Sequence, residues 1–137
     1  MKKILLSFVL IAFSSLLTAQ AADRQRSIDH TVKKLTALYK LNSQQVPKVE
    51  VIVAREFQNL EEIKPLENVD YKKYLLKKKG VILASEGSLK RILNEEQLKV
   101  LNNQKVQRRK KESAMIREMK SAGMTKEEME MKLLELY

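Results

Sequence analysis

A helix-start signal occurs twice in this 137-residue chain. It reads LNSQQV at residues 41–46 and LNEEQL at residues 93–98, 52 positions further on. In each copy an Asn side chain can accept a backbone N–H as an N-cap, and the Gln three residues later completes a capping box. Flanking apolar residues fit a hydrophobic staple. Each copy therefore predicts a helix start, and the motif residues are Leu41, Asn42, Gln45, Leu93, Asn94 and Gln97.

The composition favours long helices throughout. Only three Gly and two Pro interrupt a chain rich in Lys, Glu, Leu and Gln, which are good helix formers. Charged residues make up 32% and aromatic residues 5%, which leaves little for a deep core. We therefore expect an all-α fold, either as a thin, open helical assembly or as a dimer.

Apolar periodicity places the first two helices around the first box. Residues 23–40 fit a first helix. For the second helix Pro47 leaves two starts open: a distorted turn after the Asn42 cap, or a regular start with Pro47 as the first helical residue. Pro65 is expected to end it. Its apolar stripe consists of Val49, Ile52, Val53, Phe57 and Leu60.

Three further helices are expected in the second half of the chain. The third runs from an Asp70 N-cap to about residue 93, although its segment GVILAS, residues 80–85, is also compatible with a short buried strand. The second box opens the fourth helix near Glu95, and Gly123 ends it. Thr125 and Glu128 form another capping box, which starts a short C-terminal extension, residues 123–137.

The N-terminus has the pattern of a secretory signal. Two lysines precede an apolar run and the small-x-small sequence at residues 19–21. We predict a cleaved signal peptide, residues 1–21, and one mature domain, residues 22–137, in the periplasm; a retained N-terminal anchor is the alternative. The formal charge of +10 falls to +8 when Lys2 and Lys3 are removed. An exported basic chain favours proteins or anionic envelope surfaces as partners over nucleic acid.

Catalytic and cofactor-binding patterns do not occur in the sequence. There is no Cys and one His, His30, so a zinc site would need carboxylates for nearly all its ligands. No glycine-rich phosphate loop, HExxH motif or nucleophile–base pair is present. We therefore expect a protein that is not an enzyme and that uses no cofactor and no metal.

Two basic runs and a group of methionines are the candidate binding features. The runs are residues 77–79 and 108–111; each fits either a solvated helix face or a surface that attracts acidic partners over long range. Met115 and Met119 begin a Met-rich stretch that ends at residue 131. Its flexible thioethers suit adaptable binding or ordinary packing of the last helix, and their spacing is not a recognised copper ligand set.

The chain resembles the Spy/CpxP group of periplasmic stress proteins. That group carries two Leu-Thr-x-x-Gln boxes, and here they read LNSQQ and LNEEQ, with Asn replacing Thr as the cap. The resemblance covers residues 27–111. It implies four long helices in an open, cradle-like hairpin arrangement that forms a homodimer. Pro47, the two glycines of the third helix and the short last helix depart from the group.

The resemblance also implies a function. We expect an ATP-independent chaperone or envelope-stress adaptor that binds unfolded or envelope proteins. The alternatives are a regulatory subunit that docks on the periplasmic domain of a membrane sensor kinase, and a peripheral protein with weak contact to the anionic outer-membrane surface. The expected binding residues are Val49, Ile52, Val53, Phe57, Leu60, Lys77, Lys78, Lys79, Arg108, Arg109, Met115 and Met119.

Overall fold

A computed structural model describes the backbone of residues 2–137 and the side chains from residue 21 onward. Within these residues the chain is helical and forms no strand, which confirms the all-α prediction. The elements are α1 (Lys2–Tyr39), α2 (Val46–Ile63), the 3-10 helix η1 (Lys64–Asn68), α3 (Tyr71–Lys90), α4 (Glu95–Ser121) and α5 (Lys126–Leu134). Residues 80–85 lie inside α3, so the strand alternative is wrong.

The first helix begins earlier than the sequence predicted. We expected a start at residue 23, whereas α1 begins at Lys2 and continues without interruption. No Gly or Pro occurs between the two positions, so nothing in the backbone stops the helix. The predicted signal peptide, residues 1–21, falls almost entirely outside the described side chains. No helix with described side chains is long and apolar enough to cross a membrane.

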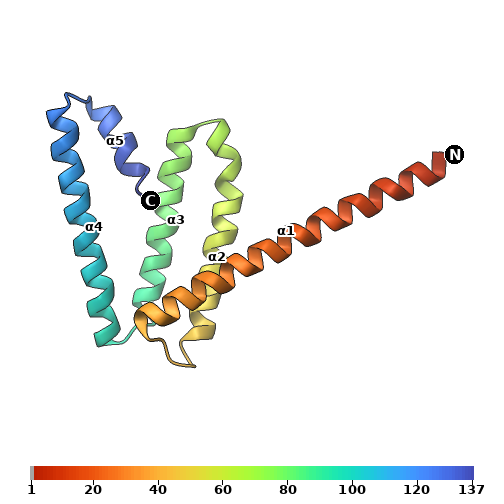
Figure 1. Cartoon of the computed structure of the whole chain (residues 1–137), viewed down its shortest axis with the longest axis horizontal. Helices are drawn as coiled ribbons and strands as arrows, with labels where there is room; N and C mark the ends of the chain where they lie inside the picture. Colours follow the sequence, from red (N-terminus) through yellow and green to blue (C-terminus); the bar gives the residue numbers. More distant parts are fainter. Residues whose placement is uncertain (1) are drawn as a thin grey trace.

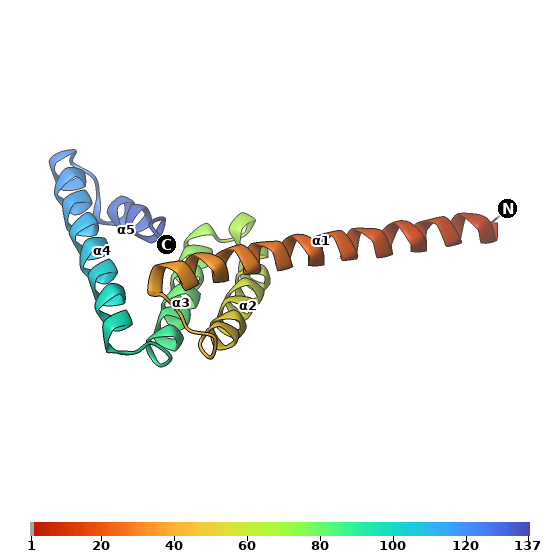
Figure 2. The ribbon, with the colours of Figure 1, turned by 60° about the horizontal axis from the view of Figure 1, so that its bottom comes forward.

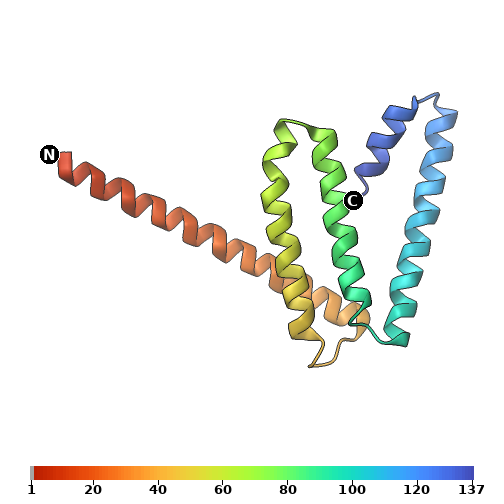
Figure 3. The same ribbon diagram turned by 180° about the vertical axis from the view of Figure 1, so that it is seen from behind.

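Helices α2 and α3 form an antiparallel hairpin, around which the other helices are placed (Figure 1). The second half of α1 crosses one side of this hairpin and packs on α2, while the first half projects away from the other helices (Figures 1 and 2). Helix α4 starts beside the end of α3 and diverges from it. Helix α5 turns back from the far end of α4 and contacts both α3 and α4 (Figure 3).

The conflict at Pro47 is resolved by a turn that precedes the second helix. The Asn42 Oδ1 accepts the backbone N–H groups of Gln44 and Gln45, both at 3.0 Å, and the Gln45 Oε1 accepts the Asn42 N–H at 3.1 Å. The regular helix then begins at Val46, with Pro47 in its first turn, where a missing N–H breaks no helical bond. The box therefore closes as predicted, but the helix starts after it.

The remaining helix boundaries follow the predicted caps. The Asp70 carboxylate accepts the Lys73 N–H at 3.0 Å at the start of α3. Asn94 with Gln97, and Thr125 with Glu128, form complete capping boxes at the starts of α4 and α5. Gly123 has φ +72 after α4, a left-handed conformation that glycine adopts without strain. Helix α3 ends at Lys90, three residues before the predicted end.

The core lies where α1, α2 and the two boxes meet. Its buried members are Ile28, Val32, Tyr39, Leu41, Val49, Ile52, Val53, Leu89, Leu93 and Leu101. Three other buried apolar side chains stand outside this cluster, one each from α3, α4 and α5: Leu75, Met119 and Leu134. The last helix is therefore supported by a separate and much smaller apolar layer.

Candidate binding surface

The side chains of Gln45 and Gln97 join the two boxes. The Gln45 Nε2 donates to the Gln97 Oε1 at 2.7 Å, and the Gln97 Nε2 donates to the Gln45 Oε1 at 2.9 Å. Both residues are buried, with 8% and 6% of their surface exposed. The two helix-start signals are thus one structural unit, although 52 residues separate them.

This amide pair satisfies its own polar atoms and those of the backbone around it. Each Oε1 also accepts the backbone N–H of the Asn in its own box, at 3.1 Å for Asn42 and 2.9 Å for Asn94. Each Nε2 also donates to a backbone carbonyl just before the other box: the Gln45 Nε2 to Ile92 at 3.0 Å, and the Gln97 Nε2 to Lys40 at 3.4 Å. Because every amide atom has partners, the pair can be buried without an unsatisfied group. It holds the end of α1 and the start of α4 at a fixed position beside α2.

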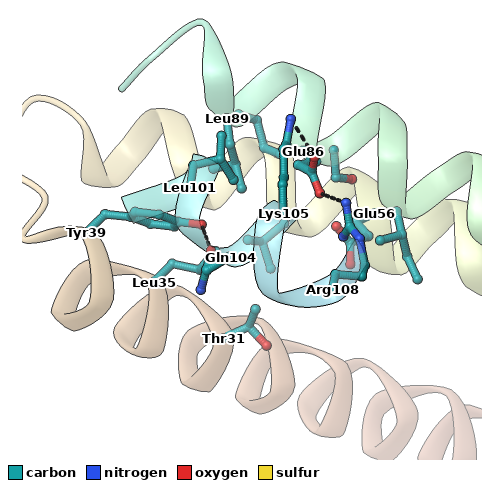
Figure 4. A pocket seen from close by; sticks show the side chains of 14 residues that line it. Thr31, Leu35, Tyr39, Glu56, Glu86, Leu89, Leu101, Gln104, Lys105 and Arg108 are labelled. Carbon is teal, nitrogen blue, oxygen red and sulfur yellow. Dashed lines mark hydrogen bonds and ion pairs between the residues drawn. The ribbon is translucent and has the colours of Figure 1, made fainter. Parts of the chain in front are cut away.

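A cavity of about 370 Å³ lies between α1, α2, α3 and α4 (Figure 4). Its apolar lining includes Leu35, Leu89 and Leu101. Polar side chains lie among them, and the Tyr39 hydroxyl donates to the Gln104 Oε1 at 2.6 Å. Since α4 contributes Leu101 and Gln104, the cavity exists only while α4 keeps its position relative to α1.

Glu86 is the centre of the charged part of the cavity. Its carboxylate pairs with the Lys105 Nζ at 2.7 Å and with an Arg108 guanidinium nitrogen at 2.9 Å (Figure 4). Partial burial acts to raise the pKa of Glu86, but the hydrogen bonds and charges of Lys105 and Arg108 outweigh it and lower the pKa. This ion pair therefore links α3 to α4 with Glu86 charged at neutral pH.

Glu56 faces the same cavity from α2 and differs from Glu86. Burial raises its pKa, and the nearby Ser85 hydroxyl acts in the opposite direction without cancelling the effect. No ion pair among the described side chains involves Glu56. Its ionised form is therefore an uncompensated charge in a partly desolvated position.

The two basic runs meet at the aromatic ring of Tyr137. The Lys79 Nζ lies 4.7 Å from the ring centroid and the Arg108 Cζ lies 5.3 Å from it. The Tyr137 hydroxyl donates to a Glu112 carboxylate oxygen at 3.0 Å. The segment after α5 thus ties α3 to α4 through two cation–π contacts and one hydrogen bond.

An apolar groove of about 390 Å³ adjoins this contact, between α3, α4 and α5. Leu76 from α3, Ile116 from α4 and Met129 from α5 line it, and Leu76 is 48% exposed. Lys79 and Lys126 supply positive charge at the same groove, and Glu130 supplies a negative charge there. Apolar surface and basic side chains are therefore adjacent at the α5 end of the molecule.

The structure divides the predicted apolar binding residues into buried and accessible ones. Val49, Ile52 and Val53 are core residues and present no surface in this conformation. Phe57 and Leu60 are half-buried. A helix stripe in the sequence does not distinguish surface that packs internally from surface that stays open, because both need the same periodicity. Of this stripe, only Phe57 and Leu60 are accessible to a partner.

The methionines divide in the same way. Met119 of α4 is buried, with 7% of its surface exposed. Met115, Met124, Met129 and Met131 are half-buried. Met119 is therefore a packing residue, and the other four border the surface near α5.

The basic residues differ in what they contact. Lys79 and Arg108 lie at Tyr137, and Arg108 also pairs with Glu86. Lys77, Lys78 and Arg109 take part in none of the ion pairs found among the described side chains. The basic runs thus combine structural contacts with charge that is open to partners.

Three residues that organise this surface were not predicted: Tyr137, Leu76 and Glu86. Tyr137 could have been noticed as an aromatic side chain that continues the apolar spacing of the last helix. Glu86 gives no local signal, since its partners come from a different helix. His30 is exposed. No group of three or more His, Asp or Glu side chains in the described part of the chain is placed to hold a metal ion.

Comparisons of the chain with protein-family models, with curated proteins and with solved structures found no match. Function is therefore inferred from the residues, their geometry and the two boxes.

Proposed function

We propose that this chain is an exported, ATP-independent chaperone or envelope-stress adaptor that binds unfolded or partner proteins. The observation that carries the proposal is the apolar groove at which Leu76, Ile116 and Met129 lie next to Lys79, a member of the first basic run, and Lys126. Basic side chains attract acidic segments over long range, and apolar surface holds them after contact. No bound nucleotide is needed for this kind of binding.

Two further features support the proposal. The resemblance of the two boxes to those of periplasmic stress proteins supports the class, and the signal-peptide pattern of residues 1–21 supports export to the periplasm. A thin helical chain with little core gains stability and binding surface by association, so the proposal includes a homodimer. Sedimentation equilibrium measures the oligomer, and fractionation of cells measures the location.

An aggregation assay tests the function. The chain without residues 1–21 is mixed at near-equal molar ratio with a denatured acidic client, and light scattering is followed at low and at high salt. We expect slower aggregation at low salt and a smaller effect at high salt, because ions screen charge attraction. Unchanged aggregation at low salt contradicts the proposal.

Charge variants show which surface acts. Replacing Lys77 and Lys78 by Gln should reduce the delay of aggregation, since both follow the groove residue Leu76 on α3 and take part in none of the ion pairs among the described side chains. The matched control replaces Lys33 and Lys34 by Gln, two exposed lysines of α1. An equal loss in both double variants points to net charge alone rather than to this surface.

A further inference from the structure

Helix α5 and the three residues after it together have the opposite charge to the surface on which they lie. Residues 126–137 contain four Glu and two Lys, in a chain whose formal charge is +10. The helix docks on α3 and α4, which carry both basic runs. The Lys72 Nζ pairs with a Glu130 carboxylate oxygen at 2.7 Å, and the Tyr137 ring lies against Lys79 and Arg108. The chain therefore already holds an acidic amphipathic helix on its basic, apolar face.

The contacts that hold α5 are shallow. Leu134 is its only buried residue, and the side chains of Lys72 and Glu130 are 47% and 48% exposed. The groove of about 390 Å³ runs along the same interface, so the apolar side chains of α5 do not fill the space between α3 and α4. A helix held by one buried side chain and exposed charge contacts is easily displaced.

The connection to α4 permits such displacement. Gly123 has φ +72, and a side chain added there would meet no atom within 4 Å, so no side-chain packing at this residue holds the turn. Helix α5 begins with its own capping box, in which the Glu128 N–H donates to the Thr125 Oγ1 at 3.2 Å. Its first turn is thus satisfied locally, whether or not α5 is docked.

We propose that the α3–α4 surface under α5 is a binding site for short acidic amphipathic helices with Leu or Met anchors, and that α5 is its tethered, displaceable occupant. This inference rests on the proposed function, because it names the class of segment that binds to the α3 and α4 walls of the groove and identifies α5 as an internal competitor for those walls. The tether keeps α5 at a high local concentration, so an external segment binds in proportion to the fraction of molecules in which α5 is released.

A peptide with the sequence of residues 124–137 is the probe, labelled for fluorescence anisotropy. It is titrated into the full chain and into two release variants, Leu134→Asp and the double variant Glu130→Lys with Tyr137→Ala. We expect both release variants to bind the peptide at least about tenfold more tightly than the unmodified chain, which corresponds to α5 being docked in about nine molecules of ten. Circular dichroism establishes that each variant keeps its helix content.

A charge exchange tests the receiving surface. Adding Lys72→Glu to Leu134→Asp should weaken binding of the natural peptide, and a peptide with Glu130→Lys should restore it. A scrambled peptide of the same composition is the control for charge alone. Equal affinity of the released and unmodified chains, no measurable binding to the released chains, or equal binding of the scrambled peptide each overturn the proposal.

The two proposals fail in different ways. If the released chains bind the peptide but no form of the protein delays client aggregation, the site exists and the chaperone function is wrong. If the unmodified chain delays aggregation but release changes neither peptide affinity nor this delay, the inference about α5 is wrong and the function stands.

Discussion

The buried Gln97 amide has two roles: its oxygen completes a capping box, and its nitrogen joins the two boxes. Replacing Gln97 by Glu separates these roles. A glutamate at this position keeps the oxygen that accepts the Asn94 N–H, so the capping box survives. It removes the Nε2 that donates to the Gln45 Oε1 at 2.9 Å and to the Lys40 carbonyl at 3.4 Å. The substitution therefore tests the joint between the boxes, and not the helix start.

We expect Gln97→Glu to lower the free energy of unfolding by about 2–4 kcal/mol near neutral pH. The carboxylate would lie in a site where Gln97 is 6% exposed, facing two oxygen atoms that lose a donor. The Gln45 Oε1 keeps the Asn42 N–H but loses one of its two donors, and the Lys40 carbonyl loses its donor too. Loss of these buried contacts costs about 1–3 kcal/mol, and the desolvated charge adds to this. Burial raises the pKa of such a carboxyl in the folded state. The deficit should therefore be largest at neutral pH, should shrink as pH falls towards about 4, and should stay at its lowest value below that, where the carboxyl is protonated in both states.

Urea unfolding followed by circular dichroism, at neutral and at acidic pH, measures this deficit. The matched control is Glu128→Gln in the exposed box of α5. Here an amide replaces a carboxylate, and the hydrogen bonds of the box are all local. It should change stability by less than about 1 kcal/mol, because the new amide keeps an acceptor for the box and only the favourable charge at the helix N-terminus is lost. A Gln97→Glu deficit as small as that of the control, or one that does not change with pH, refutes the reasoning.

Three further predictions concern the caps and the cavity. Asn94→Ala should lower the free energy of unfolding by about 0.5–2 kcal/mol in urea titrations; wild-type stability with loss of activity would instead make the box a binding motif. Glu56→Gln should raise the urea midpoint at neutral pH, because burial raises the pKa of Glu56 and its ionised form disfavours the folded state. This gain should disappear below the pKa of an unfolded glutamate, and a gain that persists in acid contradicts the assignment. Glu86→Gln should lower stability at neutral pH, and its difference from wild type should decrease as pH falls through the lowered pKa of Glu86, as measured by thermal unfolding at several pH values.

The caps made most helix boundaries predictable, because a cap is a local interaction between residues a few positions apart. Asp70, Asn94 and Thr125 each begin a helix as predicted, and Gly123 follows the end of one. The start of α1 could not be predicted in this way, because nothing at residue 23 stops a helix that begins at Lys2. The predicted start follows from the signal-peptide pattern of residues 1–21, and such a pattern does not by itself end a helix.

The binding surface was predictable only in part, since accessibility depends on which helices meet. The stripe of α2 has the periodicity of a binding face, yet α1 and α3 pack on it and bury Val49 and Val53. Leu76 gave no distinct signal within α3 and is half exposed at the groove. The local sequence does not show which of these apolar residues is buried and which is exposed. That depends on how α4 diverges from α3 and how α5 turns back between them.

One feature of the boxes nevertheless pointed to a long-range contact. A capping box requires only an acceptor at its N3 position, and the box of α5 uses the carboxylate of Glu128. Gln45 and Gln97 each carry an amide nitrogen as well. A capping box uses only the amide oxygen, so the two N–H groups of this nitrogen need partners outside the box. Buried donors require acceptors, and in this fold each amide finds them in the other box and in the carbonyl two residues before that box's Asn. Because the same offset of 52 residues relates every partner, each box satisfies the other, and a substitution in either one should weaken both helix junctions.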